Sequence, residues 1–300
     1  KPLISVQKKK KNKNKKTEKN KPKTIDRTRK LFIGGLQKRS DSGYDKHIYS
    51  SNKLIGQVPL GNRKDIRDAV EYASNESKWR SMSAHARAQV LYYAAENLDL
   101  RKDEFAQTIQ LMTGENGKEE VDQALENIFY FASWADKFEG TIHNVPIRGV
   151  SLAMKEPLGV IAIVCPDNNP LLSFIHLVFS ALCMGNTVVV VPSEKHPLCA
   201  IDMYQIFETS DFPPGAINIV TGNRDELSET LSKHMQVDGI WYFGSKEGSK
   251  KIEENSNSNL KQTWVNNGLS YSWVDLPKEI KMKSLQKSIQ IKNIWIPYGE

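Results

Sequence analysis

Residues 157–191 read PLGVIAIVCPDNNPLLSFIHLVFSALCMGNTVVVV and contain two short apolar runs. The runs are Val160–Val164 and Thr187–Val191, and each has the length of a strand that is apolar on both faces. Between them, Leu171–Met184 has the length and apolar character of a buried helix. Strands without polar alternation are typical of parallel sheets that helices cover on both faces. This strand–helix–strand unit therefore predicts an α/β fold.

The alternation of strand and helix continues toward the C-terminus. Repeated units of this kind predict a doubly wound parallel sheet, because each parallel strand needs a crossover connection to reach the next one. The expected elements are a helix over Leu198–Thr209, a strand over Ala216–Val220, an acidic helix over Asp225–Lys233, a strand over Gly239–Phe243 and a helix that opens at Gly244-Ser245.

The N-terminal half has a mainly helical pattern. Apolar residues at helical spacing run from about residue 62 to 98, and further helices are expected over Arg101–Met112 and Lys118–Phe138. Before them, Leu31–Ile33 and the glycine pair Gly34-Gly35 predict a short strand and a turn.

Two segments alternate apolar and polar residues, as exposed strands do. They are His143–Lys155, which is expected to form a hairpin, and Lys287–Pro297 near the C-terminus. The second is too apolar for a solvated tail, so we expect it to pair with the hairpin as a β-arm. The expected divisions are a disordered basic linker over 1–29, an α/β domain over 30–273 that includes the 143–155 hairpin, and a C-terminal β-arm over 274–300.

The N-terminal tail carries the positive charge of the chain. The formal net charge is +7, but residues 1–30 contain 12 Lys and 2 Arg against only Glu18 and Asp26, so the remainder is net negative. The run Lys8–Lys23 has almost no apolar residue, and we expect it to be disordered and removable without loss of the fold. We interpret the tail as a linker between modules; the alternative is nucleic-acid tethering or nuclear import. Because the run has no aromatic residue, only non-specific attraction to nucleic acid is expected.

The cysteines and the apolar runs restrict the setting of the protein. Cys165, Cys183 and Cys199 are odd in number and lack metal-binding spacing, which predicts buried thiols, no disulfide framework and no metal site. No apolar run reaches the roughly 18–20 residues that a membrane-spanning helix needs. The chain has no starting Met and a Lys-rich N-terminus without an apolar leader. We therefore expect a cytoplasmic piece of a longer polypeptide, with no membrane partner.

Ligands of doubly wound sheets lie beyond the carboxyl ends of the strands. Three loops are expected at that edge: Pro166–Pro170, Pro192–Glu194 and Gly244-Ser245. None of them is a GxGxxG fingerprint or a P-loop, so a motif search by itself says little about function.

Taken in order, several segments resemble the aldehyde dehydrogenase superfamily over roughly residues 31–268. The resemblance implies that the α/β domain is of the NAD-binding type. The segments that carry it are Glu156–Val160, Pro166–Pro170, Gly185–Val190 with Pro192–Glu194, Phe212–Gly215 through Thr221-Gly222, and Phe243–Ser245.

The resemblance implies a set of site residues. Asn168 matches the asparagine that helps to hold the oxyanion in active members, a role that needs a fixed N–H donor. Glu194 matches the acid that holds the adenosine ribose, and Gly222, Gly244 and Ser245 match residues around the cofactor. The structural alternatives are that Asn168 caps the following helix and that Gly244-Ser245 is only a tight turn with an N-cap.

The sequence departs from the family pattern at the same site. The lysine before Pro-Ser-Glu is Val191, a loop glycine is Arg224, and a helix glycine is Ser249, although Gly248 is adjacent. We therefore expect NAD binding to be weak or absent. The general-base glutamate is replaced by Asn266, whose amide cannot accept the proton that deacylation releases.

The nucleophile of the family also lacks a counterpart. Active members place a cysteine beyond the general base on a separate catalytic domain, whereas no cysteine follows Cys199 here. The residues after Gly268 are too few for that domain, so we expect it to be missing. This pattern most closely resembles the truncated, non-catalytic second module of the two-module aldehyde dehydrogenases called family 16.

Three functions remain open at this stage. The favoured one is a non-catalytic module for scaffolding or oligomerisation, whose β-arm binds another aldehyde dehydrogenase module or a second copy. The first alternative is part of an NAD-dependent aldehyde dehydrogenase whose catalytic residues lie elsewhere in the polypeptide. The second is a nucleotide-binding sensor without chemistry.

Overall fold

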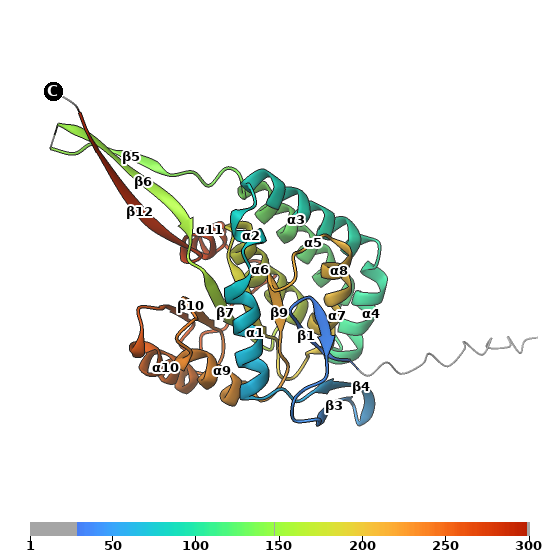
Figure 1. Ribbon diagram of the computed structural model, residues 1–300. Helices are drawn as coiled ribbons and strands as arrows, with labels where there is room; N and C mark the ends of the chain where they lie inside the picture. Colours follow the sequence, from blue (N-terminus) through green and yellow to red (C-terminus); the bar gives the residue numbers. More distant parts are fainter. Residues whose placement is uncertain (1–28, 147, 299–300) are drawn as a thin grey trace, which may run out of the picture.

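A seven-stranded sheet forms the centre of this computed structural model, which describes residues 29–146 and 148–298 (Figure 1). Across the sheet the strand order is β11-β10-β7-β8-β9-β1-β2. The five strands from β7 to β11 run parallel, whereas β1 pairs antiparallel with both β9 and β2. The α/β prediction is confirmed, with an antiparallel edge that the sequence patterns did not indicate. The strands are β1 (Leu31–Ile33), β2 (Leu36–Lys38), β7 (Val160–Val164), β8 (Thr187–Val191), β9 (Ile217–Ile219), β10 (Gly239–Tyr242) and β11 (Gln262–Val265).

Helices cover both faces of this sheet. They are α1 (Arg63–Asn75), α2 (Lys78–Ser81), α3 (Ala84–Asp99), α4 (Lys102–Thr113), α5 (Gly117–Trp134), α6 (Pro170–Cys183), α7 (Leu198–Asp202), α8 (Tyr204–Thr209), α9 (Arg224–Lys233), α10 (Lys246–Asn255) and α11 (Lys278–Lys287), with a 3-10 turn η1 (Ser256–Ser258). Among the helices of the described residues, none is both long and apolar enough to cross a bilayer.

The central strands are buried on both faces, and their side chains divide between two cores. Ile161 and Ile163 of β7 belong to the core that contains α6, whereas Val160 and Val164 belong to the core that contains α1, α9 and α10. Each of these side chains is at most 1% exposed, and such burial contributes about 1.5–3 kcal/mol per side chain. The prediction that Val160–Val164 forms a strand covered on both faces is therefore confirmed.

The helical segments are divided more finely than their apolar spacing indicated. The region from 62 to 98 forms α1, α2 and α3, because Asn62 caps α1 in a capping box with Asp65 and Ser83 caps α3. The helix expected over Leu198–Thr209 is interrupted at Met203 and gives α7 and α8. Helix α5 ends at Trp134, four residues before the expected end.

Helix α6 begins without a side-chain cap of its own. Asn169 is the N-cap residue, with φ 46° and no capping hydrogen bond. Instead, the amides of Leu171 and Leu172 donate to one carboxylate oxygen of Glu120 on α5, at 2.8 and 3.0 Å. Burial raises the pKa of Glu120 above its ordinary value, although the two amide hydrogen bonds lower it. The alternative that Asn168 caps this helix is therefore wrong, because a carboxylate from a neighbouring helix already satisfies the helix N-terminus.

A three-stranded arm extends from the body of the structure (Figure 1). It consists of β5 (Thr141–His143), β6 (Gly149–Pro157) and β12 (Ile289–Pro297), and β12 pairs antiparallel with β6 along its whole length. The predicted pairing of the C-terminal strand with the hairpin is confirmed. A separate hairpin, β3 (Asp45–Ser50) with β4 (Lys53–Pro59), lies beside the carboxyl ends of the parallel strands.

The arm strand begins later than the expected boundary at residue 274. Residues 278–287 form α11, whose Leu285 is fully buried, so this part belongs to the body. The buried amide of Asn186 ties it there, because Nδ2 donates to the carbonyls of Ser288 and Ala181, and Oδ1 accepts from Gly159 N. The basic tail over 1–28 lies outside the described residues.

The Glu120 contact gives a stability prediction. Glu120→Ala leaves two buried amides without an acceptor, and we expect the free energy of unfolding to fall by about 2–4 kcal/mol. The adjacent, exposed Glu119→Ala is the matched control and should change it by less than about 0.5 kcal/mol. Urea denaturation followed by tryptophan fluorescence measures both; equal effects of the two variants would contradict the assigned role of Glu120.

Candidate functional site

The loops that follow the parallel strands meet at one edge of the central sheet, as expected for their carboxyl ends. This edge gathers most of the side chains that the sequence singled out. They are Asp167 and Asn168 after β7, Glu194 after β8, Arg224 at the start of α9, Gly244 and Ser245 after β10, and Asn266 after β11.

Both carboxylate oxygens of Glu194 are engaged by the chain itself. Oε1 accepts from Lys46 Nζ on β3 at 3.0 Å, and Oε2 accepts from the backbone amide of Arg224 at 3.1 Å. The second contact places a negative charge at the N-terminus of α9, where the helix dipole favours it. The oxygens that the family resemblance assigns to a ribose are thus already hydrogen-bonded.

Arg224 forms an ion pair across the same edge. Its Nη2 lies 2.6 Å from Asp167 Oδ1 and its Nη1 lies 3.2 Å from Oδ2, which is the two-point geometry that guanidinium and carboxylate prefer. Asp167 also accepts from Ser193 Oγ at 2.8 Å. Burial raises the pKa of Asp167, but its contacts with Arg224 and Ser193 outweigh burial and hold that pKa below its ordinary value.

Asn168 is tied to the segment that follows β11. Its Nδ2 donates to the carbonyl of Tyr271 at 2.8 Å. Tyr271 and Trp273 pack against Phe243, with ring centroids 5.7 and 5.5 Å from that of Phe243. The segment thereby lies over the ends of β10 and β11, and the amide that the resemblance assigns to an oxyanion binds the backbone of this segment.

Asn266 joins the ends of β10 and β11. Its Oδ1 accepts from Gly244 N at 3.1 Å, and its Nδ2 donates to Leu269 O at 2.8 Å. The side chain is 7% exposed. Its amide therefore holds a turn between the ends of the two strands.

The Gly244-Ser245 pair forms a turn and an N-cap. Ser245 Oγ accepts from Gly248 N at 2.9 Å and caps α10. Buried Ser249 reinforces the same turn, because its Oγ donates to Ser245 O and accepts from Asn267 N. A tight turn with an N-cap, the alternative stated for Gly244-Ser245, therefore accounts for these contacts without a ligand.

Two further residues of the predicted site, Gly222 and Val191, are involved in packing contacts within the fold. Gly222 lies against Gly61, whose carbonyl would be 2.8 Å from an added Cβ, so glycine is needed there for the backbone approach. Val191 is 1% exposed in the core with α1 and α9. An aliphatic side chain there offers no donor to a ribose.

The three cysteines are fully buried thiols. Cys165 lies directly after β7, Cys183 ends α6, and Cys199 lies in α7. Burial raises the pKa of all three thiols, so none has the thiolate character that a nucleophile needs. The prediction that these cysteines behave as small buried hydrophobes is confirmed.

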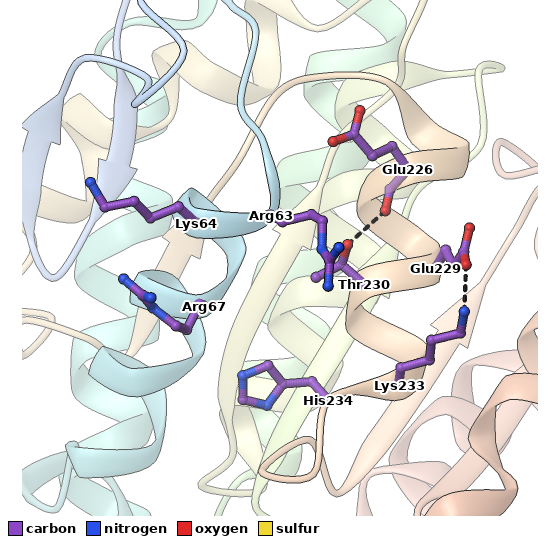
Figure 2. Close-up of a pocket in the computed structure, with 8 residues that line it drawn as sticks. All are labelled: Arg63, Lys64, Arg67, Glu226, Glu229, Thr230, Lys233 and His234. Atoms are coloured by element: carbon purple, nitrogen blue, oxygen red, sulfur yellow. Dashed lines mark hydrogen bonds and ion pairs between the residues drawn. The ribbon is translucent and has the colours of Figure 1, made fainter.

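A wider hollow of about 640 Å³ lies between α1 and α9, away from the residues of the predicted site (Figure 2). Several of its cations already contact carboxylates: Lys64 pairs with Asp41, and Lys233 pairs with Glu229. Arg63 also points toward α9, whereas Arg67 extends away from α9 (Figure 2) and contacts Asp68 at 2.9 Å. Because these charges are largely balanced, size alone does not make this groove a functional site.

Sequence patterns do not identify two members of the strand-end cluster. Asp167 was part of a recognised loop but was not assigned to a site, and Lys46 lies on a hairpin with no motif. The only available signal was the arginine at a glycine position, since a buried guanidinium requires an acidic partner nearby. Its partner is 57 residues away in sequence, which spacing rules do not cover.

The residues of this edge do not fit a dinucleotide in the arrangement observed. Each carboxylate oxygen of Glu194 already accepts a hydrogen bond from the chain, Arg224 spans the edge, and Ser245 caps the α10 N-terminus. Cys165, the thiol that follows β7, is fully buried, and burial raises its pKa. The contacts observed therefore account for folding, and we derive no chemical step from them.

Comparison with known proteins shows which family this chain resembles and how much of its relatives' length it spans. Residues 37–272 match the aldehyde dehydrogenase family. Retinaldehyde dehydrogenase 3 of Mus musculus is 34% identical over 253 residues, which cover 80% of this chain and 49% of that protein. Aldehyde dehydrogenase, cytosolic 1 of Elephantulus edwardii is 31% identical over 252 residues, with 80% and 50% covered. The chain thus spans about half the length of the curated relatives it matches.

Solved structures give the same result. The NAD-dependent aldehyde dehydrogenase of Sinorhizobium meliloti superimposes with a TM-score of 0.77 and 26% identity, over 82% of this chain and 51% of that one. Betaine aldehyde dehydrogenase of Staphylococcus aureus, solved in complex with NAD+, gives 0.76 and 27%, over 79% and 49%. Together with the match over residues 37–272, these similarities show that the chain belongs to the aldehyde dehydrogenase family.

Proposed function

We propose that this chain is a non-catalytic aldehyde dehydrogenase module that serves in assembly. The observation that carries the proposal is the three-stranded arm, which leaves an edge and apolar side chains exposed. A strand at a sheet edge presents unpaired backbone groups, and pairing with another chain satisfies them. In the order β12-β6-β5, strand β12 lies at such an edge.

Apolar side chains on both faces of the arm support the same proposal. Side chains that pair across strands lie on the same face, so Ile294 and Ile296 of β12 lie beside Leu152 and Val150 of β6. On the opposite face, Trp295 is 57% exposed. A small sheet needs a neighbour to bury its apolar face, and clustered exposed apolar residues mark interaction sites.

The partner is proposed to be a second copy of the chain or a complete aldehyde dehydrogenase module. Half-length similarity to aldehyde dehydrogenases supports the second partner, because such a module supplies the nucleophilic cysteine and the base. In that assembly, the partner module catalyses aldehyde oxidation, and this chain holds the partner module in place. NAD then serves the partner, and binding to this chain is proposed to be weak or absent.

The first prediction is that the purified chain does not oxidise aldehydes. Incubated with NAD+ and an aldehyde, it should give no NADH absorbance above a blank without protein, because its three thiols are buried with raised pKa values. A native aldehyde dehydrogenase is the positive control. NADH formation that disappears on Cys165→Ala or Cys183→Ala would overturn the prediction.

The second prediction concerns the arm. Deleting residues 290–300 removes β12 but keeps α11 and its buried Leu285, so the body should stay folded. We expect the intact chain to associate at tens of micromolar, alone or mixed with its partner module, and the truncated chain to be monomeric. Light scattering gives the mass, and circular dichroism checks the fold.

Two matched variants accompany this deletion. Ile294→Lys with Ile296→Lys should weaken association without shortening the chain, since both side chains lie on one face of the arm. Removing residues 1–23 should change neither the number of chains in the assembly nor the melting temperature. An intact chain that stays monomeric at tens of micromolar, with and without the partner module, would show that the assembly role is wrong.

A further inference from the structure

Two hollows lie side by side at the carboxyl ends of the parallel strands, and they share one wall. The first, of about 340 Å³, is lined by residues after β7, β10 and β11, which include Asn168, Gly244 and Asn266. The second, of about 530 Å³, is lined by the β3 strand and by the loop after β8, which includes Glu194. Asp167 and Arg224 line both hollows.

The shared wall is the ion pair between Asp167 and Arg224. Both terminal nitrogens of the guanidinium contact the carboxylate, and the two side chains are only 26% and 14% exposed. The arginine is also anchored through its backbone, because its amide donates to Glu194 Oε2 at 3.1 Å. A long, flexible side chain is thus held in one position at both of its ends.

We propose that Arg224 is a built-in block of the dinucleotide crevice. Its guanidinium, held by Asp167, divides what would be one continuous cleft along the strand ends into two hollows. Removal of the guanidinium joins them. This inference rests on the crevice alone and is independent of the assembly role of the arm, so either can fail without the other.

The charge state of the pair keeps the block closed at neutral pH. The pKa of Asp167 lies below its ordinary value of 3.8, since contacts with Arg224 outweigh the effect of burial. The carboxylate therefore stays ionised at every pH above about 4. Acidity in the physiological range does not open the crevice.

The test is a gain of NAD+ binding on removal of the pair. Arg224→Gly by itself would leave an unpaired carboxylate that repels the pyrophosphate, so the variant used is Asp167→Asn with Arg224→Gly. We expect it to bind NAD+ at least about tenfold more tightly than the wild-type chain in titration calorimetry. Arg63→Ala, in the groove between α1 and α9, is the control arginine and should leave the wild-type affinity unchanged (Figure 2).

A second variant separates loss of the block from loss of the fold. Asp167→Asn with Arg224→Ala keeps the helix propensity of the first residue of α9, and its melting curve checks folding. A gain in NAD+ affinity in a folded variant supports the block. A folded variant without any gain overturns it, and so does a wild-type chain that itself binds NAD+ at low micromolar concentration.

Discussion

Strands β7 and β8 are covered on both faces, so their backbone groups find partners only in neighbouring strands of the sheet. These strands run parallel, so each connection between them needs a crossover, and the helices of the crossovers cover the sheet. The parallel course also brings every carboxyl end to one edge, where loops from distant parts of the sequence meet. The position of the crevice therefore follows from the parallel course of the central strands, before any side chain at the edge is considered.

Most polar groups at that edge are hydrogen-bonded to one another, although the buried Nε of Arg224 and Nε1 of Trp273 have no hydrogen-bond partner among the residues that the structure describes. Asp167 holds Arg224, Glu194 holds Lys46 and the α9 N-terminus, and Asn266 joins two strand ends. The arm shows the opposite condition, with an open strand edge and exposed apolar side chains at the far end of the same chain. The paired side chains of the crevice and the open edge of the arm together support the proposal that this chain binds another protein.

Local pattern predicted the sheet, the arm and the place of the crevice, because burial on both faces and strand alternation are properties of neighbouring residues. It did not predict contacts between loops. The ion pair of Arg224 with Asp167 spans 57 residues, and the acceptor at the α6 N-terminus comes from Glu120 on another helix, so Asn168 was given a capping alternative that it does not fulfil. The boundary of the arm was misplaced for a related reason: the burial of Leu285 against the body is a tertiary contact.

Hydrogen exchange of the arm tests the central claim most directly. The β12 amides that point away from β6 should exchange quickly in the dilute chain and slow down when the protein concentration is raised to tens of micromolar or the partner module is added, because pairing at the open edge protects them. Amides of α1, in the body, serve as the internal reference and should not change. If amides of the α/β body become protected while the β12 amides continue to exchange quickly, the contact lies elsewhere and the proposed role of the arm is wrong.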